Sequence, residues 1–411
     1  MCTKRKGFDK TMNSEKAQKV YKIIMLIIIT ALVSSLITAV VVTERLTSSS
    51  SIESIANGDG TTGIETTLAY IRTLLEKDYI GELDDEQMIE MAIKGYVAGV
   101  GDEYTVYYTP EEMNSEYDEA MGNYVGIGIY MIVNYEKGTI EVVEPMDNSP
   151  ALEAGLQKGD MIISVNGKDL TADNVKELSN EIKGEEGTTV KLGIKRGEET
   201  FEVDVERKRI EVSHIESKML DNNIAYIQVL DFDGGTAKEF KENYENLKND
   251  GATSLIIDIR GNGGGVVDEA IDMLEMICDE GSTLLIETDK NGNEEIIKSE
   301  EKPIIDIPIV VLVNENSASA SEIFAGALKD NEKATIIGTK TYGKGVIQTL
   351  LKLADGSGLK MTTEEYCTPN RNKINKIGIE PNITVELPED IDEITEENDT
   401  QLQRAIEELT K

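Results

Sequence analysis

The sequence predicts a multidomain chain of mixed α/β class, an α+β arrangement in which a helical region and a small β-barrel-like domain precede a larger α/β domain. Residues 120–208 contain short β-forming runs separated by Gly and Asn turns, which is typical of a small β domain. From about residue 215, apolar strands alternate with helical segments, the pattern of an α/β sheet. An uncharged run near the N-terminus adds an expected transmembrane helix. The chain has 411 residues, enough for two or three domains.

The composition excludes several chemistries. Lys and Arg number 41 against 78 Asp and Glu, a net charge of −37, so nucleic-acid binding, which needs a basic surface, is not expected. A zinc site usually needs three or four ligands that include His or Cys, and His214, Cys2, Cys278 and Cys367 lie far apart in the sequence. We therefore expect no metal, no cofactor and no disulfide framework, and catalysis without histidine.

The N-terminal residues predict a membrane anchor. Residues 1–22 form a basic tail with seven Lys and Arg against two acidic residues, and the 21 residues 23–43 carry no charge. A helix of that length crosses a hydrocarbon core of roughly 30 Å. The basic flank predicts a single-pass cell-membrane protein with its N-terminus in the cytoplasm and its catalytic domain outside. A cleaved signal peptide is the alternative, although the run exceeds the usual apolar length of about 7–15 residues.

Two segments separate this run from the β-rich domain. Residues 44–63 are rich in Ser, Thr and Gly and predict a flexible linker. In residues 64–119, apolar side chains recur at helical spacing, so we expect a helical N-terminal region. Thr109 followed by Pro110 predicts the start of one of these helices.

Two glycine-containing motifs in residues 120–208 indicate a site for a chain-terminal carboxylate. Residues 124–129 read YVGIGI, and residues 149–160 read SPALEAGLQKGD. Such glycines let backbone N–H groups point into one concavity, which suits a carboxylate, and the next strand edge can add a peptide as an extra strand. The alternative is that these glycines do no more than shape turns in an ordinary β-barrel. Both motifs resemble PDZ domains, and the resemblance places peptide binding on Val125, Gly126, Ile127, Gly128 and Ile129.

A glycine-rich turn and a serine-rich turn follow two of the predicted strands. Residues 258–265 read DIRGNGGG before a helix, so their N–H groups could stabilise an oxyanion, and the spacing of a phosphate-binding loop is missing. Ser317, Ser319 and Ser321 lie between strand 309–313 and the next helix, where small residues can expose a hydroxyl above the sheet. These serines could also be only helix N-caps, and we expect Ser321 to be one.

Lys344 lies between Gly343 and Gly345, and no acidic residue is within several positions of it, in a chain with 78 acidic residues. A lysine that acts as a general base must be neutral near pH 7, against an ordinary pKa of about 10.4. Burial without an acidic partner lowers that pKa, because it penalises the charged form. The uncharged surroundings therefore favour a catalytic lysine over an ordinary surface one.

These motifs, in this order and after a PDZ module, resemble the carboxyl-terminal processing peptidases, serine peptidase family S41, subfamily A. The family's Ser and Lys stand 25 positions apart and its Gln follows four later, and Ser319, Lys344 and Gln348 match this spacing. The resemblance extends from about residue 64 to residue 411. It implies an S41 peptidase domain at 209–390, built of ClpP/crotonase-like ββα units, and a C-terminal helical tail at 391–411.

The resemblance also implies a function, a serine endopeptidase that cleaves protein substrates with a free C-terminus near that end. In the family, the serine attacks the scissile carbonyl, the lysine acts as general base, and the glutamine orients the lysine. The oxyanion hole would use the N–H of Ala320 and one from Gly263 or Gly264. The PDZ module would read the substrate tail, and it would either recruit the substrate or inhibit the peptidase.

Two other functions fit part of the sequence. A catalytically silent membrane PDZ scaffold is one, and the intact catalytic residues argue against it. A Ser-His-Asp peptidase is the other. It would need His214, which is more simply a linker-strand residue at the PDZ exit. The helices at 64–118 and 399–410 could be packing elements or could support a homodimer.

Overall fold

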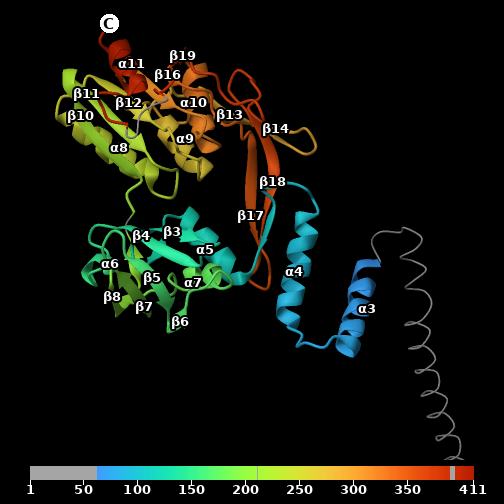
Figure 1. Ribbon diagram of the computed structural model, residues 1–411. Helices are drawn as coiled ribbons and strands as arrows, with labels where there is room; N and C mark the ends of the chain where they lie inside the picture. Colours follow the sequence, from blue (N-terminus) through green and yellow to red (C-terminus); the bar gives the residue numbers. More distant parts are fainter. Residues whose placement is uncertain (1–62, 211, 389–393) are drawn as a thin grey trace, which may run out of the picture. The chain divides into compact units, whose positions relative to one another are not determined.

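The computed structural model describes residues 63–388 except residue 211, and residues 394–411 (Figure 1). The chain divides into two compact units, Met1–Met91 and Ala92–Lys411. The predicted basic tail and most of the linker lie outside the described residues.

The structure corrects the predicted architecture at the transmembrane helix. Within the described residues, no helix is both long and apolar enough to cross a membrane. The run that carried the prediction, residues 23–43, lies outside those residues. That prediction rested on the apolar length of the sequence alone, and the described fold contains no membrane span. The location outside the cytoplasm depended on that span and stays a prediction.

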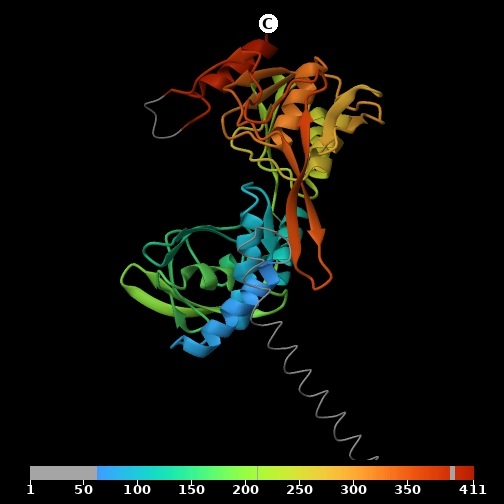
Figure 2. The ribbon, with the colours of Figure 1, turned by 90° about the vertical axis from the view of Figure 1, so that its right-hand side faces the viewer.

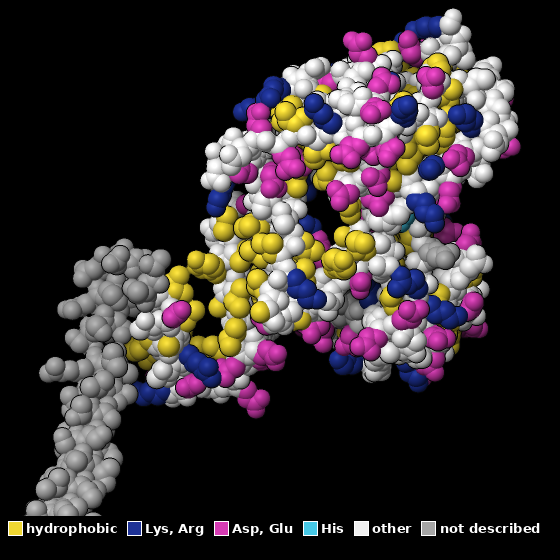
Figure 3. Space-filling model, turned by 180° about the vertical axis from the view of Figure 1, so that it is seen from behind, with side chains coloured by type: hydrophobic (Ala, Val, Ile, Leu, Met, Phe, Trp, Pro, Cys, Tyr) yellow, Lys and Arg dark blue, Asp and Glu magenta, His cyan; other side chains and the backbone are white. Residues whose placement is uncertain are grey.

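The helical N-terminal region forms α3 (Gly63–Asp78) and α4 (Asp85–Ala98), as the apolar spacing predicted. Neither helix buries any of its residues. Large apolar side chains such as Ile71, Leu74 and Tyr96 are exposed, and hydrophobic side chains lie at the surface in Figure 3. The homodimer that such helices could support stays a prediction.

Helix α5 (Pro110–Ala120) begins where the sequence predicted a helix start. The Thr109 hydroxyl accepts a hydrogen bond from the N–H of Glu112, and the Glu112 carboxylate accepts one from the N–H of Thr109. This reciprocal pair is a capping box, which satisfies two backbone donors at the start of the helix. Strand β1 (Val106–Tyr108), just before it, pairs with the peptidase strand β18.

The β-rich domain contains one main sheet in the order β3-β4-β5-β7-β8, with β6 (Lys168–Asp169) on β5. A separate pair joins the first and last strands of the domain, β2 (Tyr124–Gly126) and β9 (Lys208–Ile210). Apolar side chains from strands and helices of this domain fill one core. The remaining elements are β3 (Ile129–Asn134), β4 (Thr139–Pro145), α6 (Pro150–Glu153), β5 (Met161–Val165), α7 (Val175–Asn180), β7 (Thr189–Arg196) and β8 (Glu199–Glu206).

The larger domain is built on a six-stranded sheet in the order β10-β11-β12-β15-β16-β19. The strands are parallel except β10, which runs antiparallel to β11. Their bounds are Ile215–Leu220 (β10), Ile224–Val229 (β11), Ser254–Asp258 (β12), Ile309–Val313 (β15), Thr335–Gly338 (β16) and Ile383–Thr384 (β19). A 3₁₀ turn at Asp221–Asn223 joins β10 to β11.

Helices cover both faces of this sheet (Figure 1). One face packs against α8 (Thr236–Asn249), α9 (Val267–Glu275) and α10 (Ala320–Asp330). The other face packs against α11 (Thr400–Leu409), whose Leu402 and Ala405 are buried on it. Burial on both faces explains why the central strands are continuous apolar runs without alternation.

A second, antiparallel sheet was not predicted from the sequence. It has the order β1-β18-β13-β14, and β17 also pairs with β18. Figure 2 shows β17 and β18 as long paired strands. The bounds are Thr283–Asp289 (β13), Glu294–Lys298 (β14), Val346–Lys352 (β17) and Gly358–Cys367 (β18). Strand β17 begins directly after the Lys344 loop, so this sheet supports the predicted catalytic lysine.

Candidate active site

Ser319 occupies a sharp turn between β15 and α10. It is the N-cap of α10, with φ 57° and ψ −117°, a backbone conformation that costs a non-glycine residue strain energy. Ser317 donates its hydroxyl proton to the carbonyl of Ile259 at 2.8 Å. Among the described residues, the Ser319 hydroxyl donates no hydrogen bond to protein. The strained turn therefore leaves one free hydroxyl proton at the start of the helix.

The structure corrects the role expected for Ser321. It lies inside α10, not at its cap, and its Oγ donates to the carbonyl of Asn262 at 2.9 Å. Ala318 donates its N–H to the same carbonyl at 3.0 Å. The serine-rich turn is thus tied directly to the glycine-rich turn after β12, and both turns are held in one place.

The glycine-rich turn lies against the nucleophile candidate. A Cβ on Gly264 would come within 2.8 Å of Ser319 Cβ and 3.0 Å of the Ala320 nitrogen, and its φ of 106° also favours glycine. The Gly264 N–H donates to Asn262 Oδ1 at 2.8 Å. Within the described residues, the N–H groups of Gly263 and Ala320 make no hydrogen bond. The geometry therefore favours Gly263 and Ala320 as donors to an oxyanion.

Glu322 holds the serine loop and the lysine loop together. Its side chain is fully buried. One carboxylate oxygen accepts the N–H of Ser319 at 3.1 Å and that of Lys344 at 2.8 Å. The other accepts the Thr341 hydroxyl at 2.6 Å and the Gly343 N–H at 2.8 Å. The sequence motifs gave Glu322 no role, although an acidic residue three positions after a helix-capping serine is a capping-box signal.

Tyr366 connects the same two loops from the second sheet. Its hydroxyl lies within hydrogen-bonding distance of the carbonyls of Lys344, at 2.6 Å, and Ser319, at 3.1 Å. Burial raises the pKa of Tyr366 far above its ordinary value, so the hydroxyl keeps its proton and donates. The backbones of the predicted nucleophile and base are therefore adjacent.

The side chain of Lys344 rests on an aromatic ring. Its Nζ lies 4.4 Å from the centre of the Tyr104 ring, a cation–π contact. Within the described residues, Nζ makes no hydrogen bond with Ser319 Oγ or with Gln348. The structure thus joins the backbones of the two loops, and within the described residues it shows no hydrogen bond between the serine and lysine side chains.

Burial lowers the pKa of Lys344, and the positive charge of Lys360 lowers it further. Asp102, Glu103 and Glu322 act in the opposite direction. The uncharged surroundings inferred from the sequence are therefore local to the loop, since carboxylates approach from other elements. The net direction, a lysine that loses its proton more easily, agrees with the prediction.

Gln348 forms its side-chain hydrogen bond with β18 and, within the described residues, none with Lys344. Its Nε2 lies 3.3 Å from the Thr362 hydroxyl, which donates to Asp102 at 2.7 Å. Asp102 also accepts the Thr105 hydroxyl at 2.5 Å. Gln348 is thus part of a chain of polar groups that reaches the Gly101–Thr105 segment, which also supplies the ring beneath Lys344.

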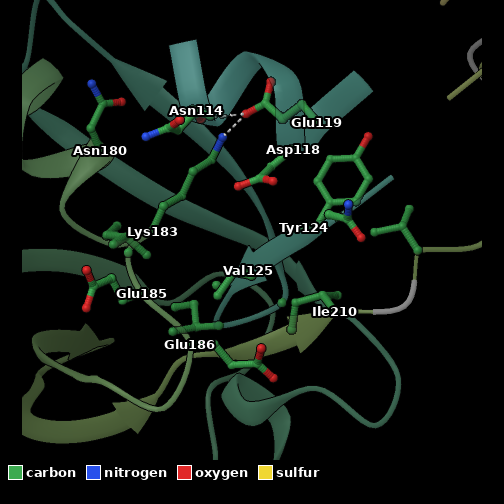
Figure 4. A pocket seen from close by; sticks show the side chains of 18 of the residues that line it. Asn114, Asp118, Glu119, Tyr124, Val125, Asn180, Lys183, Glu185, Glu186 and Ile210 are labelled. Atoms are coloured by element: carbon green, nitrogen blue, oxygen red, sulfur yellow. Dashed lines mark hydrogen bonds and ion pairs between the residues drawn. The ribbon is translucent and has the colours of Figure 1, made fainter. Parts of the chain in front are cut away.

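The five residues predicted to bind peptide line a groove of about 1130 Å³ in the β-rich domain. Within the described residues, the N–H groups of Ile127 and Gly128 make no hydrogen bond, and a Cβ on Gly128 would come within 2.5 Å of Ser149. Acidic side chains line much of the groove, and Lys183 is the only basic residue among those lining it. Lys183 forms an ion pair with Glu119, drawn as a dashed line in Figure 4.

His214 lies away from the three serines. It is buried just before β10, and its Nδ1 is 2.7 Å from a carboxylate oxygen of Asp231. Its backbone N–H donates to Glu239. No contact in the described part of the chain joins its ring to Ser317, Ser319 or Ser321, so the geometry gives no support to a Ser-His-Asp peptidase.

Comparison with known proteins agrees with this geometry. Residues 223–385 match peptidase family S41, and residues 141–196 match the PDZ domain. The carboxy-terminal processing protease CtpA of Bacillus subtilis is 36% identical over 372 residues, which are 90% of this chain and 78% of that protein. A Staphylococcus aureus protein described as a CtpA-like serine protease is 36% identical over 318 residues, 77% of this chain and 63% of that protein.

A solved structure shows the same fold. A protein from Bacteroides fragilis described as an S41 protease superposes with a TM-score of 0.50 at 16% identity, covering 81% of this chain and 92% of that one. The photosystem II D1 C-terminal processing protease is 27% identical, with a TM-score of 0.48, over 78% of this chain and 88% of that chain.

Proposed function

Because the chain belongs to peptidase family S41 and is a serine peptidase of the carboxy-terminal processing type, we propose that it cleaves proteins near their C-termini with Ser319 and Lys344. The observation that carries this proposal is the free Ser319 hydroxyl, held beside unpaired N–H groups and fixed to the Lys344 loop through Glu322. This arrangement supplies a nucleophile, a base and an oxyanion site without histidine.

The proposed reaction has two stages. Neutral Lys344 takes the proton from Ser319 Oγ as the oxygen attacks the scissile carbonyl. The N–H groups of Ala320 and Gly263 stabilise the oxyanion, a contribution of about 10²–10³ in rate for one such donor. Lys344 then gives its proton to the departing amine, which leaves an acyl-enzyme. Water hydrolyses the ester with Lys344 again acting as base.

The lysine must move for this reaction. Its Nζ lies over the Tyr104 ring, and a cation–π contact is worth about 0.5–1 kcal/mol at exposed sites and about 2 kcal/mol when desolvated. The neutral base form of Lys344 loses this attraction, so side-chain rotation, with substrate bound, can bring Nζ to Ser319 Oγ. Catalytic hydrogen bonds are often absent until substrate binds. Gln348 would then position the lysine from β17.

We also propose that the PDZ groove reads the free carboxyl end of the substrate. The unpaired N–H groups of Ile127 and Gly128 belong to residues that line the groove just before β3, where a carboxylate can accept from both. The peptide would extend the sheet along β3, the edge strand of the main PDZ sheet.

The test is a peptide with an apolar tail and a free carboxyl end, offered to purified protein. Ser319→Ala and Lys344→Ala should each lower kcat by at least about 10³-fold while the protein stays folded. Lys340→Ala is the matched control, because Lys340 is exposed and its one ion pair among the described residues is with Glu380. Cleavage that survives in Lys344→Ala would refute the Ser-Lys mechanism.

A further inference from the structure

The only histidine of the chain lies in a cluster of possible metal ligands outside the catalytic residues. One ligand atom each from His214, Asp231 and Asp233 can be chosen so that all lie within 4.8 Å of one another. Tetrahedral zinc with bonds of about 2.1 Å places its ligands roughly 3.4 Å apart. Small side-chain rotations would therefore bring these three atoms onto one ion.

The histidine of this cluster already faces one of the two carboxylates. The His214 side chain is 6% exposed, and its Nδ1 lies 2.7 Å from Asp231 Oδ1, an ion pair when the ring is protonated. A metal ion bound by both atoms would take the place of that proton.

The cluster is held in place by surrounding hydrogen bonds. His214 donates its N–H to Glu239 at 2.9 Å, and its carbonyl accepts the N–H of Leu230 at 2.9 Å. Asp231 Oδ1 accepts the N–H of Asp233 at 3.0 Å. The Tyr124 hydroxyl donates to Asp233, and ligating carboxylates in metal sites usually have a supporting hydrogen bond of this kind.

An ion could reach this place from solvent. The Asp231 side chain is 33% exposed. His214 also lines a separate surface pocket with Gly122, Gly234 and Glu239. Imidazole nitrogen with two carboxylates is a donor set that suits zinc and its first-row neighbours.

We propose that His214, Asp231 and Asp233 form a binding site for a divalent metal ion of the zinc type, with Tyr124 supporting Asp233. The proposal goes beyond peptide cleavage, and its residues take no part in the Ser-Lys chemistry. It also departs from the expectation of no metal site, because that expectation considered only His and Cys residues.

The site lies beside the oxyanion turn. Phe232, between the two aspartates, donates its N–H to the carbonyl of Gly264 at 3.0 Å and accepts the N–H of Val266 at 2.9 Å. A Cβ on Gly265 would come within 2.6 Å of the Phe232 backbone. A bound ion would thus hold three segments together. These are strand β2 of the PDZ domain, through Tyr124, the linker before β10, through His214, and the segment around Phe232 that is hydrogen-bonded to the oxyanion turn.

The experiment is calorimetric titration of Zn²⁺ into the chelator-treated full chain, with excess Mg²⁺ to occupy carboxylate-only sites. We expect one zinc per chain, at least tenfold weaker binding in His214→Gln and Asp231→Asn, and about 10–100-fold weaker binding in Tyr124→Phe. Glu242→Gln is the control, since Glu242 lines the neighbouring pocket without belonging to the ligand set. Circular dichroism without metal confirms that each variant is folded.

Two further measurements make the result independent of proteolysis. Zinc should slow hydrogen exchange of the Phe232 amide and raise the thermal midpoint of the parent protein but not of His214→Gln. Co²⁺ should give a visible spectrum without a thiolate charge-transfer band. No binding, equal affinity in His214→Gln, or a thiolate band that assigns the ion to cysteine would overturn the proposal, whether or not the chain cleaves peptides.

Discussion

At the scale of single residues, the buried carboxylate of Glu322 accepts four hydrogen bonds that reach both catalytic loops. Glu322→Gln keeps the shape but turns an amide N–H₂ toward backbone donors. We expect about 2–3 kcal/mol of lost stability in urea unfolding and a lower kcat. Glu315→Gln is the matched control, since Glu315 is exposed and contacts Thr339. Unchanged stability in Glu322→Gln would contradict this role.

The pKa of Lys344 gives a pH prediction with opposite signs in two variants. In the proposed mechanism the free base of Lys344 is the active form, so kcat/KM should rise with pH as Lys344 loses its proton. Burial is the main cause that lowers the pKa of Lys344, and the positive charge of Lys360 lowers it further. The negative charge of Glu103 raises the pKa of Lys344. Lys360→Gln should therefore move the acid limb of the profile to higher pH, and Glu103→Gln should move it to lower pH. Shifts of the same sign would refute the assignment of that limb to Lys344.

The sequence singles out Ser319 as the predicted nucleophile, but it could not predict all that surrounds this residue. Counting back from Lys344 separated Ser319 from Ser317 and Ser321, and of these three hydroxyls only that of Ser319 donates no hydrogen bond among the described residues. Tyr104 lies far from Lys344 in the sequence, so no local pattern could place its ring beneath the lysine. Contacts of this kind depend on the folded chain.

At the scale of elements, α11 joins the peptidase domain through Leu402, which is 4% exposed. Its apolar side packs on Ile256, Val310 and Leu312 of the sheet, so that side is not available to a second copy. Leu402→Ala should cost about 2–5 kcal/mol, measured by urea unfolding. Glu407→Ala, on the exposed side of the same helix, should change stability little. A small effect of Leu402→Ala would mean that α11 is only loosely attached.

The sequence predicted some strands much better than others. Strand β15 has the predicted bounds, 309–313, because burial on both faces demands continuous apolar residues. Strands β17 and β18 were missed, because most of their residues are only partly buried or exposed. Their sequences mix Thr, Lys and Glu with apolar residues, so hydrophobic patterning gives a weak signal.

At the scale of the whole molecule, the PDZ domain can be removed with a defined junction. Gly126 of β2 pairs with Lys208 of β9, so an Asn-Gly turn between them would close the pair as a hairpin. We expect the shortened protein to cleave peptides with free and amidated C-termini at equal rates, and the full chain to prefer the free carboxyl end. The ratio of the two kcat/KM values is the measurement. Persistent preference in the shortened protein would place tail recognition elsewhere.

The order of the modules was predictable, whereas the transmembrane helix was predicted wrongly and the proposed metal ligands were not foreseen. The PDZ and S41 motifs are local sequence patterns with fixed spacing, which a single chain can show. Apolar length alone predicted the transmembrane helix, and no helix of that kind occurs in the described residues. His214 and the two aspartates come from different segments, so only the fold brings them together.

Arg260 links the start of the oxyanion turn to a much later part of the chain. It contacts Asp258 at 2.6 Å and Asp399, 139 positions further on, at 2.8 Å, and Gln401 accepts another of its hydrogen bonds. A buried ion pair is strongly destabilising when one partner is missing. During translation, Arg260 therefore lacks its later partners until residues 399–401 have been synthesised. We therefore expect the start of the oxyanion turn to be fully held in place only after α11 has been made.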